Sequence, residues 1–192
     1  VETAMQTTLN LRSKVIVIGD PAVGKSALCQ MFHSNGAQYP KNYATTLGCD
    51  FLVKVVNIPD ANASVELFLF DTAGQGIFKD MFPKFWEGAS SIMLVYDATR
   101  VESFQNCAFW LDQVQKARPD RRLPGVLVAN KIDLEDRIVV HAGMGAEFAE
   151  ANSLEFFQCS AAKNMDVDIP FNFLAAQFYK SYEDKLELLS NM

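Results

Sequence analysis

The feature that most constrains the fold is a glycine-bounded segment, Gly-Asp-Pro-Ala-Val-Gly-Lys-Ser, at residues 19–26. The β-branched run before it predicts a strand at residues 14–18 that is buried on both faces. In residues 25–32 after it, Leu28, Met31 and Phe32 recur with the spacing of an amphipathic helix. A glycine-bounded loop between a strand and a helix is typical of a phosphate-binding loop, although one such segment alone could also be an ordinary turn.

The loop has the groups that a nucleotide phosphate requires. Backbone N–H groups and the positive end of the following helix attract an anion. We expect Lys25 to reach the β and γ phosphates and the Ser26 hydroxyl to bind Mg²⁺. In this segment and at the residue after it, the residues predicted to contact nucleotide are Asp20, Pro21, Ala22, Val23, Gly24, Lys25, Ser26 and Ala27. The loop does not identify the base.

The rest of the pattern predicts an α/β fold with a six-stranded, mostly parallel sheet and helices on both faces. Two apolar segments joined by Pro-Asp-Ala-Asn-Ala predict a hairpin, and therefore one antiparallel edge strand. The strands predicted after the first lie at residues 51–58, 64–70, 91–96, 125–129 and 154–159. We expect one domain over residues 1–192, with an amino-terminal extension at 1–13, a core at about 14–180 and the end of the last helix at 181–192.

Three helices are predicted between and after the later strands. The first, at 101–116, is expected to bury Phe104, Cys107, Ala108 and Leu111; the last is expected to bury Phe171, Leu174, Ala175 and Phe178. The helix at 140–151 is the least favourable of the three. Its Gly143 and Gly145 each cost about 1 kcal/mol relative to alanine.

Composition argues against several classes of partner. The net charge of −6 argues against general affinity for nucleic acid or acidic membrane surfaces. The four cysteines are far apart, which favours free thiols over disulfides or a zinc site. No cysteine follows Cys159, so we expect no lipid anchor at the tail, and the apolar runs are too short to span a membrane.

A second loop follows the predicted strand 64–70. In Asp71-Thr72-Ala73-Gly74-Gln75, we expect Asp71 to hold Mg²⁺, Gly74 to offer its N–H to the γ phosphate and Gln75 to orient the attacking water. Asp and Gly are also common in ordinary turns, which leaves that alternative open for this loop alone.

Two further loops point to guanine. In Asn130-Lys131-Ile132-Asp133, the Asp133 carboxylate matches the two N–H donors of guanine, and adenine would leave it unsatisfied. Taken alone, this loop could instead be an Asx turn that caps a helix. In Ser160-Ala161-Ala162-Lys163, the Ala161 N–H can donate to guanine O6. All four loops follow strands, so they are expected to meet at one edge of the sheet.

Together these motifs resemble the Ras-like small GTPases, specifically the Rab branch, over about residues 15–179. The resemblance implies a GTP/GDP switch with Mg²⁺ held by Ser26, Thr46 and Asp71. It adds Tyr39, against the guanine, and Tyr43 to the nucleotide-binding residues, together with Asn130, Lys131, Ser160 and Ala162.

Residues 19–25, 64–71 and 123–128 resemble the Rab-like GTPases of intraflagellar transport. That resemblance implies a cytoplasmic protein of the cilium or flagellum and its base. It also implies a heterodimer with a β-sandwich transport subunit, other subunits of transport complex B, and activating and exchange proteins. Recruitment by protein contacts is expected in place of a lipid.

The sequence departs from the Rab pattern at three points of the site. Pro21 replaces a small residue, Gly76-Ile77 replaces a charged pair, and Ala162 replaces a lysine. The first two bear on hydrolysis, and the third on stacking against the base.

Two functions follow from this interpretation. As an enzyme, the protein would use Lys25 and Gln75 as catalytic residues and hydrolyse GTP slowly, because no internal arginine finger is evident. As an architectural subunit, it would bind GTP with negligible turnover. Part or most of the apolar segment after Gln75 is expected to face the core, and the remainder would suit a partner surface that changes with the γ phosphate. An adenine-specific P-loop enzyme is disfavoured by Asn130 and Asp133.

Overall fold

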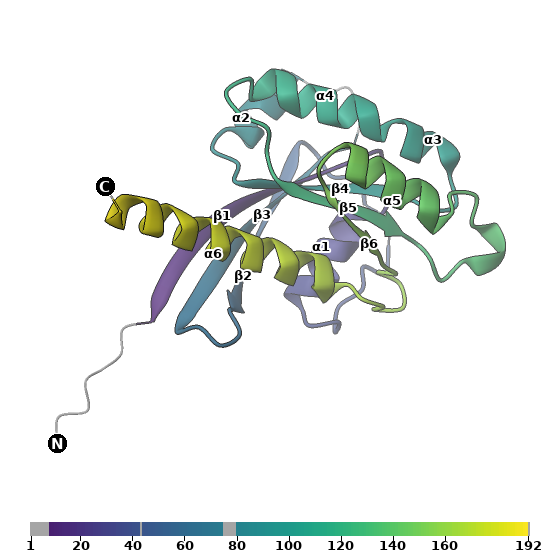
Figure 1. Ribbon diagram of the computed structural model, residues 1–192. Helices are drawn as coiled ribbons and strands as arrows, with labels where there is room; N and C mark the ends of the chain where they lie inside the picture. Colours follow the sequence, from purple (N-terminus) through teal and green to yellow (C-terminus); the bar gives the residue numbers. More distant parts are fainter. Residues whose placement is uncertain (1–7, 43, 75–79, 192) are drawn as a thin grey trace.

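The computed structural model describes residues 8–42, 44–74 and 80–191 and contains a six-stranded sheet (Figure 1). The strand order is β2-β3-β1-β4-β5-β6, and β2 pairs antiparallel with β3 while every other neighbouring pair is parallel. The predicted sheet with its antiparallel edge strand is therefore confirmed. The strands are β1 (Leu9–Ile18), β2 (Cys49–Asn57), β3 (Ala63–Thr72), β4 (Ser91–Asp97), β5 (Gly125–Asn130) and β6 (Glu155–Gln158).

Helices cover both faces of the sheet, as predicted (Figure 1). They are α1 (Lys25–His33), α2 (Phe82–Trp86), α3 (Val101–Gln105), α4 (Cys107–Ala117), α5 (Ala142–Ala151) and α6 (Asp168–Ser190). A short 3₁₀ helix, Glu135–Arg137, follows β5. None of the helices in the described ranges is long and apolar enough to cross a membrane.

Alternate side chains of β1 supply both cores. Val15 and Val17 pack with α1 and α6, whereas Ile16 and Ile18 pack with α2, α4 and α5. Successive side chains of a strand point to opposite faces, so a run of β-branched residues fills both layers at once. This arrangement fixes the carboxyl end of β1, and with it the start of the phosphate-binding loop.

The first strand is longer than predicted. It begins at Leu9 and pairs with β3 from Leu9–Ala63 onward, so residues 9–13 of the predicted extension belong to the sheet. The prediction relied on a continuous apolar run, and this part of the strand has none. The exposed Asn10 and Arg12 alternate there with the half-buried Leu9 and Leu11.

The predicted helix 101–116 is two short helices joined at Asn106. The backbone stays helical there, with φ −72° and ψ −7°, so the chain direction is kept. The prediction of which residues this helix buries was partly wrong. Cys107 is buried as predicted, and so are Trp110 and Val114, whereas Ala108 is exposed. Trp110 replaces Ala108 in the core because its ring packs on Phe82 of α2.

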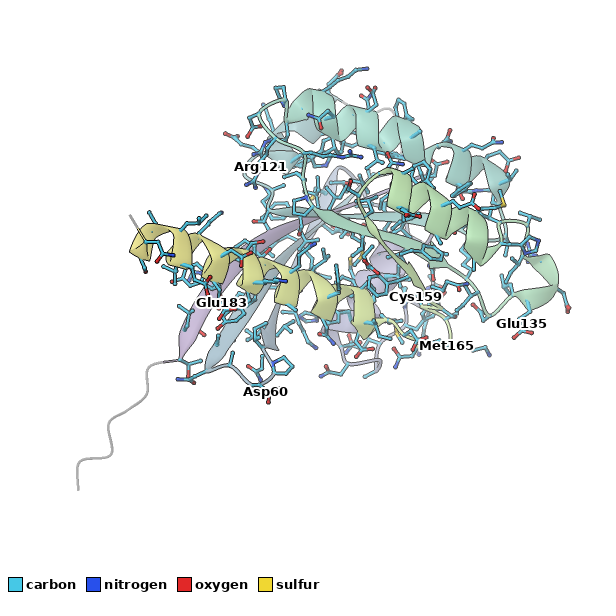
Figure 2. The ribbon with its side chains drawn as sticks, in the orientation of Figure 1. Asp60, Arg121, Glu135, Cys159, Met165 and Glu183 are labelled. Atoms are coloured by element: carbon cyan, nitrogen blue, oxygen red, sulfur yellow. The ribbon has the colours of Figure 1, made fainter. Side chains whose placement is uncertain are left out.

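The last helix buries Phe171, Leu174 and Ala175 as predicted, with Phe178 partly buried. Its carboxyl-terminal part carries exposed leucines: Leu186, Leu188 and Leu189 are 45%, 67% and 68% exposed. Glu183, labelled in Figure 2, lies on this outer part of α6.

Candidate nucleotide site

A cavity of about 400 Å³ lies at the carboxyl ends of β1 and β3 and contains most of the predicted phosphate site. It is lined by Pro21, Ala22, Gly24, Lys25, Ser26, Ala27, Gln30, Tyr39, Pro40, Asn42, Ala44, Thr45, Thr46, Asp50, Gly74 and Lys131. A larger cavity of about 860 Å³ lies between α1, β2 and α6, but none of the predicted site residues lines it. The chemistry therefore identifies the smaller cavity as the candidate site.

The phosphate-binding loop turns sharply at two glycines. Gly19 has φ 139° and Gly24 has φ 100°, conformations that side chains rarely adopt. A Cβ at Gly19 would also lie 2.1 Å from the Val95 carbonyl oxygen, so this position has no room for a side chain. Both glycines are thus required for the turn from β1 into α1.

Lys25 lies under the loop and is only 6% exposed. Its Nζ donates hydrogen bonds to the carbonyl oxygens of Gly19 and Asp20, each at 2.9 Å. Burial lowers the pKa of Lys25 to about 8, against the opposing attraction of Asp71 and Asp20. The ammonium group is therefore held by the loop itself, at the position predicted to face the phosphates.

Ser26, Thr46 and Asp71, the predicted metal ligands, come together. Ser26 Oγ donates to Asp71 Oδ2 at 2.5 Å and lies 3.1 Å from Thr46 Oγ1. Burial raises the pKa of Asp71, which the hydrogen bond from Ser26 and the charge of Lys25 oppose.

This oxygen cluster fits Mg²⁺. Asp71 Oδ1 is buried and has no hydrogen-bond partner among the described residues, as expected of a carboxylate oxygen that serves a cation. Two hydroxyls and a carboxylate are hard oxygen donors of the kind that Mg²⁺ prefers. No group of three or more His, Cys, Asp or Glu side chains arranged for a metal occurs in the described part of the chain.

Asn130 joins three of the predicted loops. Its Nδ2 donates to the Val23 carbonyl at 2.8 Å, and its Oδ1 accepts from the Ala161 N–H at 3.2 Å. A Cβ on Gly24 would lie 2.2 Å from the same amide nitrogen. The role of Asn130 visible here is thus to hold the phosphate loop and the two base-recognition loops together.

Lys131 makes a second bridge from β5 to the phosphate loop. Its Nζ donates to the Ala22 carbonyl at 2.7 Å and pairs with Asp97 Oδ2 at 2.6 Å. Burial alone would raise the pKa of Asp97, but hydrogen bonds from Lys131 and Thr99 bring it below its ordinary value. Asp97 at the end of β4 was not among the predicted site residues.

The base-recognition loops also meet. Ser160 Oγ donates to Asp133 Oδ1 at 2.6 Å, and the Lys163 N–H donates to Ser160 Oγ at 3.1 Å. Figure 2 labels a residue beside each loop: Cys159 directly precedes Ser160, and Glu135 follows Asp133 by two residues. Asp133, Ser160, Ala161 and Ala162 lie outside the lining of the phosphate cavity. Tyr39 lines it and is 48% exposed.

The side chain of Asp20 does not face the cavity. Its carboxylate accepts from Trp110 Nε1 and Asn106 Nδ2, each at 2.8 Å, so the prediction of nucleotide contact remains only for its backbone. Sequence reasoning missed Asn106 and Trp110 as partners of this loop, since they lie 86 and 90 residues away. The predicted residues Tyr43 and Gln75 lie outside the described residues.

The fold and this loop arrangement define a P-loop nucleotide-binding protein, and comparison with known proteins gives its class. The chain belongs to the Ras family, because that family's model matches residues 14–180. It is a small GTPase of the Ras/Rab type.

Within this class, the chain is similar to "Intraflagellar transport protein 27 homolog" of Bos taurus, with 45% identity over 180 residues. The match covers 94% of this chain and 97% of that protein. "Intraflagellar transport protein 27" of Chlamydomonas reinhardtii is also 45% identical, over 93% of this chain and 90% of its own. "GTP-binding protein YPT1" of Saccharomyces cerevisiae is 35% identical, and the match covers 88% of this chain and 79% of that protein.

Proposed function

We propose that this GTPase is a GTP/GDP switch that requires Mg²⁺, hydrolyses GTP slowly and acts in intraflagellar transport. The single observation that carries the nucleotide part is the cluster built on one cavity: Lys25 and Ser26 line it, and Asp71 accepts a hydrogen bond from Ser26. Asn130 joins the phosphate-binding loop beside this cavity to the guanine loops. The hydrogen bonds of Asn130 and Lys131 to the phosphate-binding loop join residues 107 and 109 positions apart at one edge of the sheet.

Each residue has a distinct proposed role. The loop N–H groups and Lys25 would bind the β and γ phosphates, and the Gly74 N–H would contact the γ phosphate. Ser26, Thr46 and Asp71 would hold Mg²⁺, which neutralises phosphate charge when bound. Asp133 would select guanine, while Ser160 orients its carboxylate through the 2.6 Å hydrogen bond. Gln75 would position the attacking water.

Slow turnover is part of the proposal. No arginine is among the described residues that line the cavity, so none of them adds a guanidinium to Lys25 and Mg²⁺ for neutralising charge on the transferred phosphoryl. Isolated Ras hydrolyses GTP at a rate on the order of 10⁻⁴ per second for a related reason. We expect a similar order here, with acceleration by a partner arginine.

The second candidate function is an architectural subunit in which bound GTP stabilises the fold and turnover is negligible. The exposed leucines of α6 favour a constant partner at a place remote from the cavity. The two candidates differ in hydrolysis, not in binding.

The test is single-turnover hydrolysis of GTP by the purified protein with Mg²⁺, comparing the wild type with Gln75→Leu. Binding is established first, by showing that GDP displaces a fluorescent GTP analogue and that ATP does not. A slow rate that falls at least tenfold in the variant supports the switch. Tight binding with no turnover in either protein supports the architectural subunit, and absence of guanine-nucleotide binding overturns both.

The proposed role in transport rests on the names of the similar proteins. In a ciliated cell, the tagged chain is expected in the cilium and at its base, in a stable complex with a β-sandwich subunit of transport complex B. A diffuse distribution, with no such subunit recovered after salt washing, would contradict this part of the proposal while leaving the nucleotide chemistry intact.

A further inference from the structure

A tether joins the phosphate-binding loop to helix α4. Each oxygen of the Asp20 carboxylate accepts one hydrogen bond: Oδ1 accepts from Trp110 Nε1 and Oδ2 from Asn106 Nδ2, both at 2.8 Å. The next residue, Pro21, has no N–H, and its carbonyl oxygen accepts from Arg100 Nη2 at 2.8 Å. Three donors from α3 and α4 and the residues at their ends thus hold two consecutive loop residues.

Gly74 also packs against the peptide bond between Asp20 and Pro21. A Cβ on Gly74 would lie 2.4 Å from the Pro21 nitrogen and 2.7 Å from the Asp20 carbonyl oxygen, so Gly74 packs directly on this peptide. That carbonyl oxygen also accepts from Lys25 Nζ at 2.9 Å. The position of the Asp20–Pro21 peptide therefore determines where both Lys25 and Gly74 lie.

Trp110 extends the connection to α2. Its ring is 2% exposed and lies 5.6 Å from the Phe82 ring, which in turn stacks on Trp86 at 4.9 Å. One side chain therefore contacts both the phosphate loop and the helix that follows the Gly74 segment. Its indole N–H fixes the loop, and its ring fixes the helix.

We propose that Trp110 and Asn106 are positioning residues of the nucleotide site, which act through Asp20 to hold the phosphate-binding loop in its nucleotide-retaining shape. The proposal rests on the proposed function, since it concerns retention of GDP and GTP. It gives Asp20 a purpose other than phosphate contact and makes helix α4 a determinant of nucleotide release.

The chain offers a matched pair of variants for the test. Trp110→Phe keeps an aromatic ring against Phe82 and removes the N–H that binds Asp20. Trp86→Phe makes the same change in the same aromatic cluster, but Trp86 Nε1 is buried with no hydrogen-bond partner among the described residues. A loss that comes only from packing affects both variants, and a loss of the tether affects Trp110→Phe alone.

The measurement is the dissociation rate of a fluorescent GDP analogue from the Mg²⁺-bound protein. We expect Trp110→Phe to release it roughly tenfold faster than Trp86→Phe, the factor given by loss of a hydrogen bond to an ionised acceptor. Asp20→Ala is expected to act similarly. The double variant Asp20→Ala/Trp110→Phe should be no faster than the faster single variant, because both remove one interaction.

A spectroscopic readout separates positioning from a structural role. In the ¹⁵N-tryptophan spectrum, Asp20→Ala should shift the indole signal that Trp110→Phe removes and leave the Trp86 signal in place. Equal release rates for Trp110→Phe and Trp86→Phe, or additive effects in the double variant, overturn the tether. Failure of the wild-type protein to bind GDP instead overturns the proposed function, so the two failures are distinguishable.

Discussion

At the scale of single residues, buried polar atoms with partners from distant segments hold the site together. Asp97, at the end of β4, is 4% exposed and accepts from Lys131 Nζ at 2.6 Å and from both the N–H and the hydroxyl of Thr99. The hydroxyl contact is 2.6 Å long. Asp97 thereby fixes Lys131, which in turn holds the Ala22 carbonyl of the phosphate loop.

Thr99→Val removes the hydroxyl donor while nearly preserving volume. The pKa of Asp97 is below its ordinary value, so these hydrogen bonds stabilise the fold above about pH 4 and lose their effect as pH falls through the folded-state pKa. We expect the variant to lose about 1 to 2 kcal/mol of unfolding free energy at pH 7 and less at pH 3, which is below the unfolded-state pKa of about 3.9. Urea denaturation at the two pH values measures this.

Thr99→Ser is the control, because it restores the hydroxyl without the methyl group. Its unfolding free energy should stay close to that of the wild type at pH 7. An equal loss for Thr99→Val at both pH values would show that packing, and not the charge of Asp97, accounts for its effect.

Single residues of the site divide clearly into those predictable from sequence and those not. Ser26 and Asp71 stand in motifs with local spacing, and the structure places them 2.5 Å apart. Trp110 gave no such signal, because a tryptophan on a buried helix stripe is ordinary core and its acceptor is 90 residues away. Contacts of this kind depend on the packing of α4 against the sheet.

At the scale of elements, periodicity located every strand of the sheet, but not every end. The Val-Ile-Val-Ile run of β1 was evident because it is buried on both faces, whereas the half-exposed residues 9–13 were not. The division between α3 and α4 was not predicted for another reason. Hydrogen bonds from Asn106 N to Glu102 O and from Trp110 N to Asn106 O continue the helical pattern across it, so the apolar spacing is that of one helix.

Replacing the two glycines of α5 by alanine is expected to change the stability of the protein in opposite directions. A Cβ at Gly143 has nothing within 4 Å, whereas a Cβ at Gly145 would lie 2.5 Å from the Phe156 ring and 2.6 Å from the Tyr96 hydroxyl. We expect Gly143→Ala to stabilise the protein by about 0.5 to 1 kcal/mol through helix propensity. Gly145→Ala should destabilise it by about 1 to 3 kcal/mol through overpacking.

Urea denaturation of the two variants against the wild type measures both effects. Each variant controls for the other, since both replace glycine by alanine within one helix. Stabilisation by both substitutions would show that β6 can move away from α5 at little cost. The sequence suggested only that both glycines weaken the helix; the structure shows that Gly145 is needed for contact with β6.

At the scale of the whole molecule, the sheet topology brings the site residues together. The strand order β2-β3-β1-β4-β5-β6 puts the ends of β1, β3, β5 and β6 on one edge, so the four loops meet although each is short. This convergence was predictable from the strand–helix alternation. The links between the loops, through Asn130 and Lys131, required the structure.

Because those loops meet only in the folded chain, a nucleotide that binds them stabilises the fold by mass action. GDP with Mg²⁺ at about 100 times its dissociation constant should add about 2.7 kcal/mol, which raises Tm by roughly 5 to 11 °C for a domain of this size. ATP at the same concentration should raise Tm little, since adenine lacks the pair of N–H donors that the Asp133 carboxylate would accept from guanine. Differential scanning fluorimetry with GDP, ATP and each plus EDTA measures this, and Asp71→Asn should remove most of the difference that EDTA makes. An equal rise with ATP and GDP would show that Asp133 does not select the base. A GDP effect that EDTA reduces as much in Asp71→Asn as in the wild type would place Mg²⁺ outside the cluster of Ser26, Thr46 and Asp71, and one that EDTA does not reduce in the wild type would show that GDP binds without Mg²⁺.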